Sequence, residues 1–148
     1  MKSYFQHLFT YNQWAYGLFK DLLIADDFEH KEIQKLLSHC HNAESIWMDR
    51  IKGKPPRVGV WDTYSFQECF ERLKSSNQEW VKMIASAPDF DRIVTYVNSR
   101  GDHFESRLSD IIIHVANHGT HHRGQISLLL RKMNIKPPAT DFILFSRA

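Results

Sequence analysis

Four histidines lie close together near the end of the chain, at His114, His118, His121 and His122. Imidazole nitrogens are ligands for zinc, nickel, copper and ferrous iron, whereas calcium and magnesium prefer oxygen ligands. Spacings of three and four residues place side chains on neighbouring turns of a helix, where they can converge on one point. The cluster therefore suggests a transition-metal site.

The residues around these histidines have the periodicity of an α-helix. At about 100° per residue, His122 falls inside the apolar stripe of this helix and His118 lies beside it, whereas His114 and His121 lie at its margin. Two imidazoles therefore point into an apolar interior, where a polar group without a partner is costly. A metal ion would be such a partner, and another helix should then supply a further ligand. The stripe consists of Ile111, Val115, Ile126, Leu129 and Met133.

A candidate third ligand lies in a helix predicted over residues 29–52. His39 lies about 40° from Ala43 in its apolar stripe and can face inward, whereas His41 lies about 160° from Ala43 and is predicted to be a surface residue. A single inward histidine is more often a core residue with satisfied hydrogen bonds. The pair His118 and His122 nevertheless makes His39 the candidate third ligand. The stripe consists of Ile33, Leu36, Leu37, Cys40, Ala43, Trp47 and Ile51.

Sequence motifs of several other metal and catalytic sites are missing from the chain. It contains no HExxH protease motif and no ExxH motif of the di-iron carboxylate bundles. It also lacks a GxSxG nucleophile motif, a Walker loop and a CxxC pair. A dication held only by imidazoles keeps its charge uncompensated, so that it would lower the pKa of a bound water or thiol.

The composition predicts one globular domain over residues 1–148, in the cytoplasm. The chain is 43% hydrophobic with a net charge of +2, and its basic residues are scattered, so we expect no nucleic-acid partner. Its apolar runs are too short to cross a bilayer, so we expect no membrane association. The only two cysteines, Cys40 and Cys69, lie in helical patterns and are predicted to be reduced core thiols.

The first helix is predicted over residues 4–23. Its buried stripe contains one strongly polar residue, Asn12, for which a buried hydrogen bond is the preferred interpretation over a role in the site. Tyr11, Trp14 and Leu18 form a second apolar strip, and we predict that it makes a homodimer contact.

The remaining elements are predicted from caps, prolines and a change of period. Asp26 and Asp27 offer helix caps. Residues 54–64 are predicted to form a long loop. Residues 65–68 form a capping box that opens a third helix, which ends at Pro88. Residues 93–97 and 103–104 suggest a short hairpin lid or a connector, of which we predict the hairpin. The fourth helix is predicted to begin at 106–109 and to run to Met133, and the tail 141–148 to pack back. The predicted fold is all-α: a four-helix bundle with crossover connections and a short β-hairpin before the last long helix.

The chain resembles the DinB-like (DinB/YfiT) metal-binding four-helix bundles along nearly its whole length. The matching segments are Tyr11–Ala15, the pattern His39…Glu44…Trp47…Arg50, and the motif HVANHGTHHRGQ at residues 114–125. Members of this family bind one divalent metal through a histidine of the second helix and an HxxxH pair of the fourth. The resemblance therefore implies that His39, His118 and His122 are the ligands, the same three that the helical geometry selects.

The resemblance also implies a range of functions. Related branches transfer low-molecular-weight thiols or use them to isomerise small molecules. Our leading hypothesis is a metal-dependent enzyme that activates such a thiol for transfer to an electrophilic small molecule. Zinc or nickel is the preferred metal, with iron, manganese or copper as alternatives.

Two other hypotheses remain open at this point. One is a hydrolase that uses a bound hydroxide, for which Glu44 is the best available general base. The other is a non-enzymatic, dimeric metal-binding protein of the stress response. His114, His121, Arg123 and Gln125 either support the ligands or have structural roles, of which structural roles are the preferred interpretation.

Overall fold

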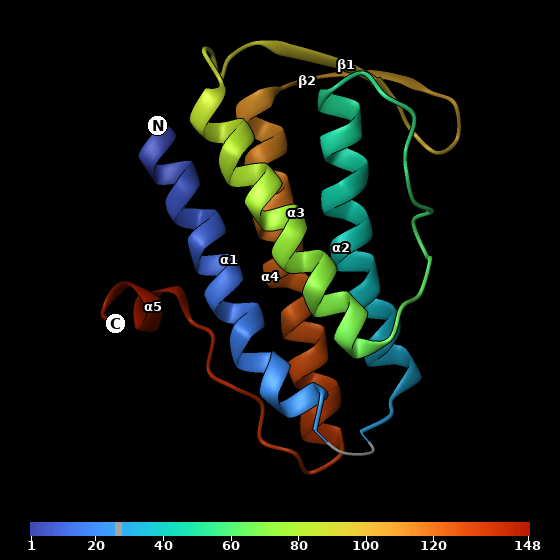
Figure 1. Cartoon of the computed structure of the whole chain (residues 1–148), viewed down its shortest axis with the longest axis vertical. Helices are drawn as coiled ribbons and strands as arrows, with labels where there is room; N and C mark the ends of the chain where they lie inside the picture. Colours follow the sequence, from blue (N-terminus) through green and yellow to red (C-terminus); the bar gives the residue numbers. More distant parts are fainter. Residues whose placement is uncertain (26–27) are drawn as a thin grey trace.

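The computed structural model describes residues 1–25 and 28–148, and these residues are mostly helical (Figure 1). A two-stranded antiparallel hairpin precedes the last long helix, as predicted. The caps predicted at Asp26 and Asp27 lie outside the described residues. The elements are α1 (Lys2–Leu23), α2 (Lys31–Ile51), α3 (Phe66–Ser86), β1 (Ile93–Val97), β2 (His103–Arg107), α4 (Leu108–Lys132) and α5 (Phe142–Ser146).

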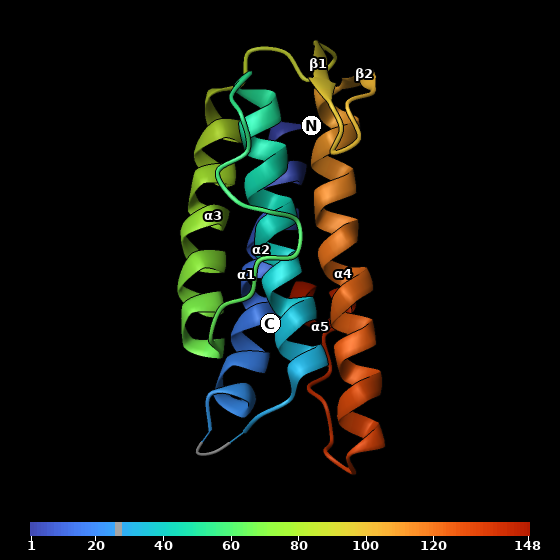
Figure 2. The same ribbon diagram turned by 90° about the vertical axis from the view of Figure 1, so that its right-hand side faces the viewer.

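The long helices α1, α2, α3 and α4 of the described residues lie side by side, with the hairpin at one end (Figures 1 and 2). Helix α1 packs against α3 and α4, and α2 packs against the same two helices. Helices α2 and α3 both run toward the hairpin end, whereas α1 and α4 run away from it. The connection between α2 and α3 therefore returns along the side of the helices from one end to the other (Figure 2). This return path places residues 52–65 against α2, where they contribute to the site described below.

Local signals in the sequence explain where the helices begin. The predicted capping box opens α3: the backbone N–H of Glu68 donates to the Ser65 hydroxyl at 3.2 Å, and the Ser65 N–H donates to the Glu68 carboxylate at 3.0 Å. Helix α2 begins after His30, whose Nδ1 accepts the N–H of Ile33 at 3.2 Å. Orphan N–H groups of both first turns thus have side-chain acceptors.

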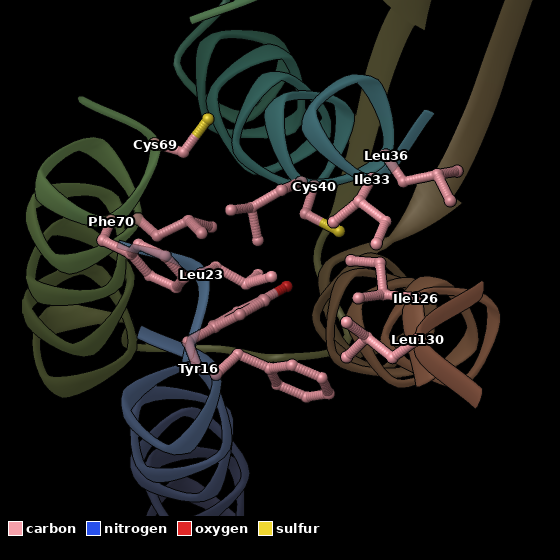
Figure 3. Close-up of a cluster of buried hydrophobic side chains, with 12 residues drawn as sticks. Tyr16, Leu23, Ile33, Leu36, Cys40, Cys69, Phe70, Ile126 and Leu130 are labelled. Atoms are coloured by element: carbon pink, nitrogen blue, oxygen red, sulfur yellow. The ribbon is translucent and has the colours of Figure 1, made fainter. Parts of the chain in front are cut away.

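Two clusters of buried side chains hold the helices together. The cluster far from the hairpin joins Tyr16 of α1, Cys40 of α2, Phe70 of α3 and Ile126 of α4, whose side chains point toward one another (Figure 3). The other cluster lies nearer the hairpin and is built around Trp80. Both cysteines are buried and free, so the prediction that they are core thiols is confirmed.

The C-terminal segment packs back onto α1, as predicted. The Phe142 and Phe145 rings lie 5.1 and 5.7 Å from the Tyr11 ring, and the Trp14 ring lies 5.6 Å from that of Phe145. The Tyr11 hydroxyl donates to the Thr140 carbonyl at 2.7 Å. The apolar strip that we predicted as a homodimer contact is therefore covered in part by the chain itself.

In residues 1–25 and 28–148, we find no helix that combines the length and the apolar character needed to cross a membrane.

Candidate metal centre

The three predicted ligands, His39 of α2 and His118 and His122 of α4, meet between these two helices. The Nε2 atom of His118 lies 3.1 Å from the Nε2 atom of His39 and 3.1 Å from that of His122. One nitrogen from each ring lies within 4.8 Å of the other two. The turn-by-turn spacing of His118 and His122 places both rings on the side of α4 that faces α2.

Hydrogen bonds fix two of these rings with their lone pairs facing the centre. The Nδ1 atom of His39 lies 3.0 Å from the Val60 carbonyl, and that of His122 lies 2.6 Å from Oε1 of Gln125. Because a carbonyl oxygen only accepts, each Nδ1 carries the proton and each Nε2 presents a lone pair. Histidines that bind metals typically donate their other N–H in this way. The tautomers therefore suit metal binding.

The separation of the nitrogens also fits a metal ion. Two lone pairs that face each other repel unless a cation or a proton lies between them. In a tetrahedral zinc site with bonds of about 2.05 Å, neighbouring nitrogens are about 3.3 Å apart, close to the 3.1 Å between the paired Nε2 atoms here. The donor set thus fits one divalent transition metal.

The environment of His118 and His122 favours the neutral form of both rings. Burial, with the neighbouring imidazoles of His122 and His39, lowers the pKa of His118 to about 3. Burial likewise lowers the pKa of His122, although its hydrogen bond with Gln125 acts in the opposite direction. Neutral imidazole is the form that binds a metal, so these rings need not lose a proton near neutral pH before they bind one.

An aromatic ring covers one side of the cluster. The Trp61 indole stacks on the His39 ring, with centroids 4.2 Å apart and planes inclined by 16°. Trp61 is 54% exposed, and the ammonium of Lys35 lies 4.9 Å from its ring centroid. Both Trp61 and the Val60 carbonyl belong to the connection between α2 and α3, so this loop forms one wall of the candidate centre.

The other two histidines of the sequence cluster stay outside it. His114 and His121 are exposed, and neither belongs to the group of converging nitrogens. The His114 ring lies 5.8 Å from the ring of His118, and the His121 ring lies 5.0 Å from that of His122. They border the candidate centre, as their place at the margin of the apolar stripe suggested.

The prediction that His41 is a surface residue is wrong. It is 7% exposed, and the connection between α2 and α3, which runs back along α2 (Figure 2), places Tyr64 beside it. Its ring lies 5.8 Å from that of Tyr64. Burial and the nearby Arg72 and Arg57 guanidinium groups lower its pKa to about 4. The sequence correctly placed this ring away from the three candidate ligands but did not reveal the loop that lies beside it.

Arg123 and Asn12 have a structural contact. Arg123 is 1% exposed, and its Nη2 donates to Oδ1 of Asn12 and to the Thr120 hydroxyl, each at 3.0 Å. Its guanidinium carbon also lies 4.8 Å from the Tyr16 ring centroid. These contacts join α4 to α1, so both residues stabilise the packing that positions His118 and His122.

Gly119 allows this close contact between α1 and α4, and we expect Gly119→Ala to destabilise the protein. A methyl group there would lie 2.8 Å from the Tyr16 hydroxyl and 3.0 Å from Nη1 of Arg123. We expect a net loss of about 1–2 kcal/mol in the free energy of unfolding, after the helix propensity of alanine is counted. Urea unfolding of the wild-type protein and the variant measures this difference in the free energy of unfolding.

The matched control is Gly124→Ala in the same helix, where a methyl group would have no neighbour within 4 Å. We expect this variant to gain up to about 1 kcal/mol. Equal stability of the two variants would contradict the proposed crowding at Gly119.

Glu44 is buried in the helix packing and is not part of the histidine group. Its carboxylate accepts a hydrogen bond from the Ser76 hydroxyl, and its backbone carbonyl accepts one from the Trp80 indole at 3.2 Å. Burial raises its pKa to about 7, although the Ser76 hydrogen bond and the Arg123 charge act in the opposite direction. Glu44 therefore faces α3 rather than the candidate metal centre.

Two contributors to the candidate centre were not predicted from the sequence. The Val60 carbonyl leaves no signal, because every residue has one. Trp61 had a possible signal, as an aromatic residue in a loop rich in proline and glycine, but nothing in the loop composition places it on His39.

Comparisons with known proteins agree with these observations. The family model described as "DinB family" matches residues 1–148. The chain is also similar to Protein DinB of Bacillus subtilis (strain 168). The two are 23% identical over an alignment 168 residues long, which covers 98% of this chain and 95% of that protein. The family match spans all three converging histidines. The chain belongs to the DinB family.

Proposed function

We propose that this protein binds one divalent transition metal through His39, His118 and His122. We further propose that it activates a low-molecular-weight thiol there for transfer to an electrophilic small molecule. The four long helices and the long connection between α2 and α3 support the interpretation of the fold as a four-helix bundle with a crossover connection. Such a scaffold holds the ligands of α4 opposite the ligand of α2.

The observation that carries this proposal is the composition of the converging group. Within the described parts of the chain, three imidazoles meet there without a carboxylate or a cysteine. Structural zinc sites usually have four protein ligands, whereas catalytic sites have three and leave a position open. A dication in such a site lowers the pKa of a thiol that occupies the open position and thereby favours the thiolate.

The thiol would come from outside the protein, because its own cysteines are unsuited to the reaction. Cys40 is next to His39 in the sequence, but its side chain points into the core (Figure 3). Burial raises its pKa to about 12. Burial also raises the pKa of Cys69. A small thiol abundant in a reducing cytoplasm is therefore the proposed partner.

The position of Glu44 favours thiol transfer over hydrolysis. A general base must reach the water it deprotonates, and the carboxylate of Glu44 is instead buried against Ser76 of α3. A cation has less to do for a thiol than for water, because the ordinary pKa of a cysteine thiol is about 8.5 and that of water is about 15.7. Thiol activation therefore depends less on a base, and the proton of the thiol can pass to solvent. Zinc and nickel remain the preferred metals, because imidazole binds both well.

A thiol-consumption assay tests the reaction. Protein purified without a histidine tag would be loaded with zinc or nickel and mixed with glutathione, cysteine or bacillithiol and an electrophile such as chlorodinitrobenzene. We expect the loaded protein to consume thiol faster than the uncatalysed reaction. Chelation should abolish this activity, and added metal should restore it. A protein that retains its metal but accelerates no thiol–electrophile pair would refute the transferase and leave the metal site intact.

A further inference from the structure

A pocket that shares Val60 with the candidate metal centre lies between the hairpin and the connection that follows α2. Both segments meet at the hairpin end of the helices (Figure 2). The pocket has a volume of about 700 Å³, a size typical of small-molecule sites. Its walls are mainly apolar and include Ile46, Pro56, Val58, Val60 and Tyr96.

Arg50 contributes a positive charge to this pocket. Its guanidinium carbon lies 4.5 Å from the Trp47 ring centroid and 5.1 Å from that of Tyr96, so the two rings hold it in place. Partial burial lowers its pKa from the ordinary value. The pocket also includes Lys54, and no aspartate or glutamate of the described residues lines it.

The nearby carboxylates bind other cations. Asp49 accepts from Nε of Arg57 at 2.8 Å, and Glu79 pairs with Arg57 and with Lys52. Among residues 1–25 and 28–148, no carboxylate pairs with Arg50 or Lys54. A partly desolvated guanidinium without an anion favours a ligand that supplies one.

We propose that this pocket binds a small molecule that carries a carboxylate on an apolar body, and that Arg50 pairs with the carboxylate. A guanidinium binds a carboxylate through two parallel hydrogen bonds, and the apolar walls receive the remainder of the ligand. The pocket has one firmly held cation, which matches a single negative charge better than a phosphate dianion.

The pocket and the candidate metal centre share Val60. Its carbonyl accepts the hydrogen bond from His39, and the residue also lines the pocket. A bound carboxylic acid would therefore share the Val60 wall with the candidate centre, although none of the three histidines lines the pocket itself. Its role as the thiol or the electrophile of the reaction rests on the proposed function, whereas its binding at Arg50 does not.

Calorimetric titration with a matched pair of probes tests the site. Phenylbutanoate and phenylbutanamide have the same apolar body, but only the first has a carboxylate. We expect the acid to bind at least tenfold more tightly than the amide to the wild-type protein, since each 1.4 kcal/mol corresponds to a factor of ten. Arg50→Gln should remove this difference, and Arg50→Lys should restore part of it.

Two controls separate this proposal from others. Arg100→Gln removes a charge from the exposed hairpin turn, where Arg100 pairs with Asp102, and should leave the preference for the acid unchanged. His118→Ala should also bind the acid normally, which separates this site from the metal centre. Equal binding of acid and amide, no binding of either, an unchanged preference in folded Arg50→Gln, or displacement by equimolar inorganic phosphate would overturn the proposal.

Discussion

His118→Ala is expected to lower the affinity of the protein for zinc or nickel by more than about 100-fold. Loss of an outer partner of a metal ligand typically costs about 10–100-fold in affinity, and loss of a ligand itself should cost more. His118 is central to the group, because its Nε2 lies 3.1 Å from the Nε2 atoms of both His39 and His122. Competition titration against a chromogenic chelator measures the affinity.

The matched control is His121→Ala, which removes an exposed imidazole one residue from His122. We expect this variant to change the affinity by less than about tenfold, the lower limit for an outer partner. Circular dichroism and urea unfolding of both metal-free variants would show that the fold is intact. Wild-type affinity in a folded His118→Ala would contradict the three-histidine site.

The helical periodicity of the sequence predicted the positions of the candidate ligands well. Residues at the same azimuth on one helix face the same neighbour, so the inward orientation of His118 and His122 follows from the apolar stripe around them. The same reasoning selected His39 over its neighbour His41, although these two residues are only two positions apart.

The contribution of the connection between α2 and α3 could not be predicted in this way. Periodicity describes one helix at a time and carries no information about a loop that folds back along it. The burial of His41, the hydrogen bond from His39 to Val60 and the stacking of Trp61 all depend on this loop. The predicted length of the loop was compatible with a return path, but its route depends on tertiary contacts.

The packing partners of buried polar residues were likewise only partly predictable. A buried hydrogen bond was expected for Asn12, but its partner, Arg123, is 111 residues away in the sequence. Gln125 had two possible roles in the sequence, support of the ligands or a structural contact. Its hydrogen bond with His122 places it beside a candidate ligand. Spacing indicates which face a side chain occupies, whereas the partner depends on which helices become neighbours.

The free energy of unfolding of the wild-type protein is expected to fall by about 3 kcal/mol relative to Glu44→Gln as the pH rises from about 4.5 to about 7. Burial raises the pKa of Glu44 from 4.5 to about 7, and each pKa unit corresponds to about 1.36 kcal/mol. In this range the folded protein binds more protons than the unfolded chain, so its stability decreases with increasing pH. Below pH 4.5 and well above pH 7 the difference should be constant.

Glutamine suits this comparison because it has the shape of a protonated glutamate and keeps an acceptor for the Ser76 hydroxyl, but does not titrate. His41 titrates in an overlapping range with the opposite effect, because its pKa is lowered to about 4 and its stabilising contribution is lost as the pH falls from about 6.5. It is present in both proteins and cancels in the difference. Urea unfolding at several pH values, with a chelator to exclude metal binding, measures both curves.

A difference that does not vary with pH would mean that Glu44 is ionised in the folded protein, with its charge balanced by Arg123. A carboxyl group that is protonated up to about pH 7 and buried against α3 is poorly suited to act as a general base, so the same measurement bears on the choice between thiol transfer and hydrolysis.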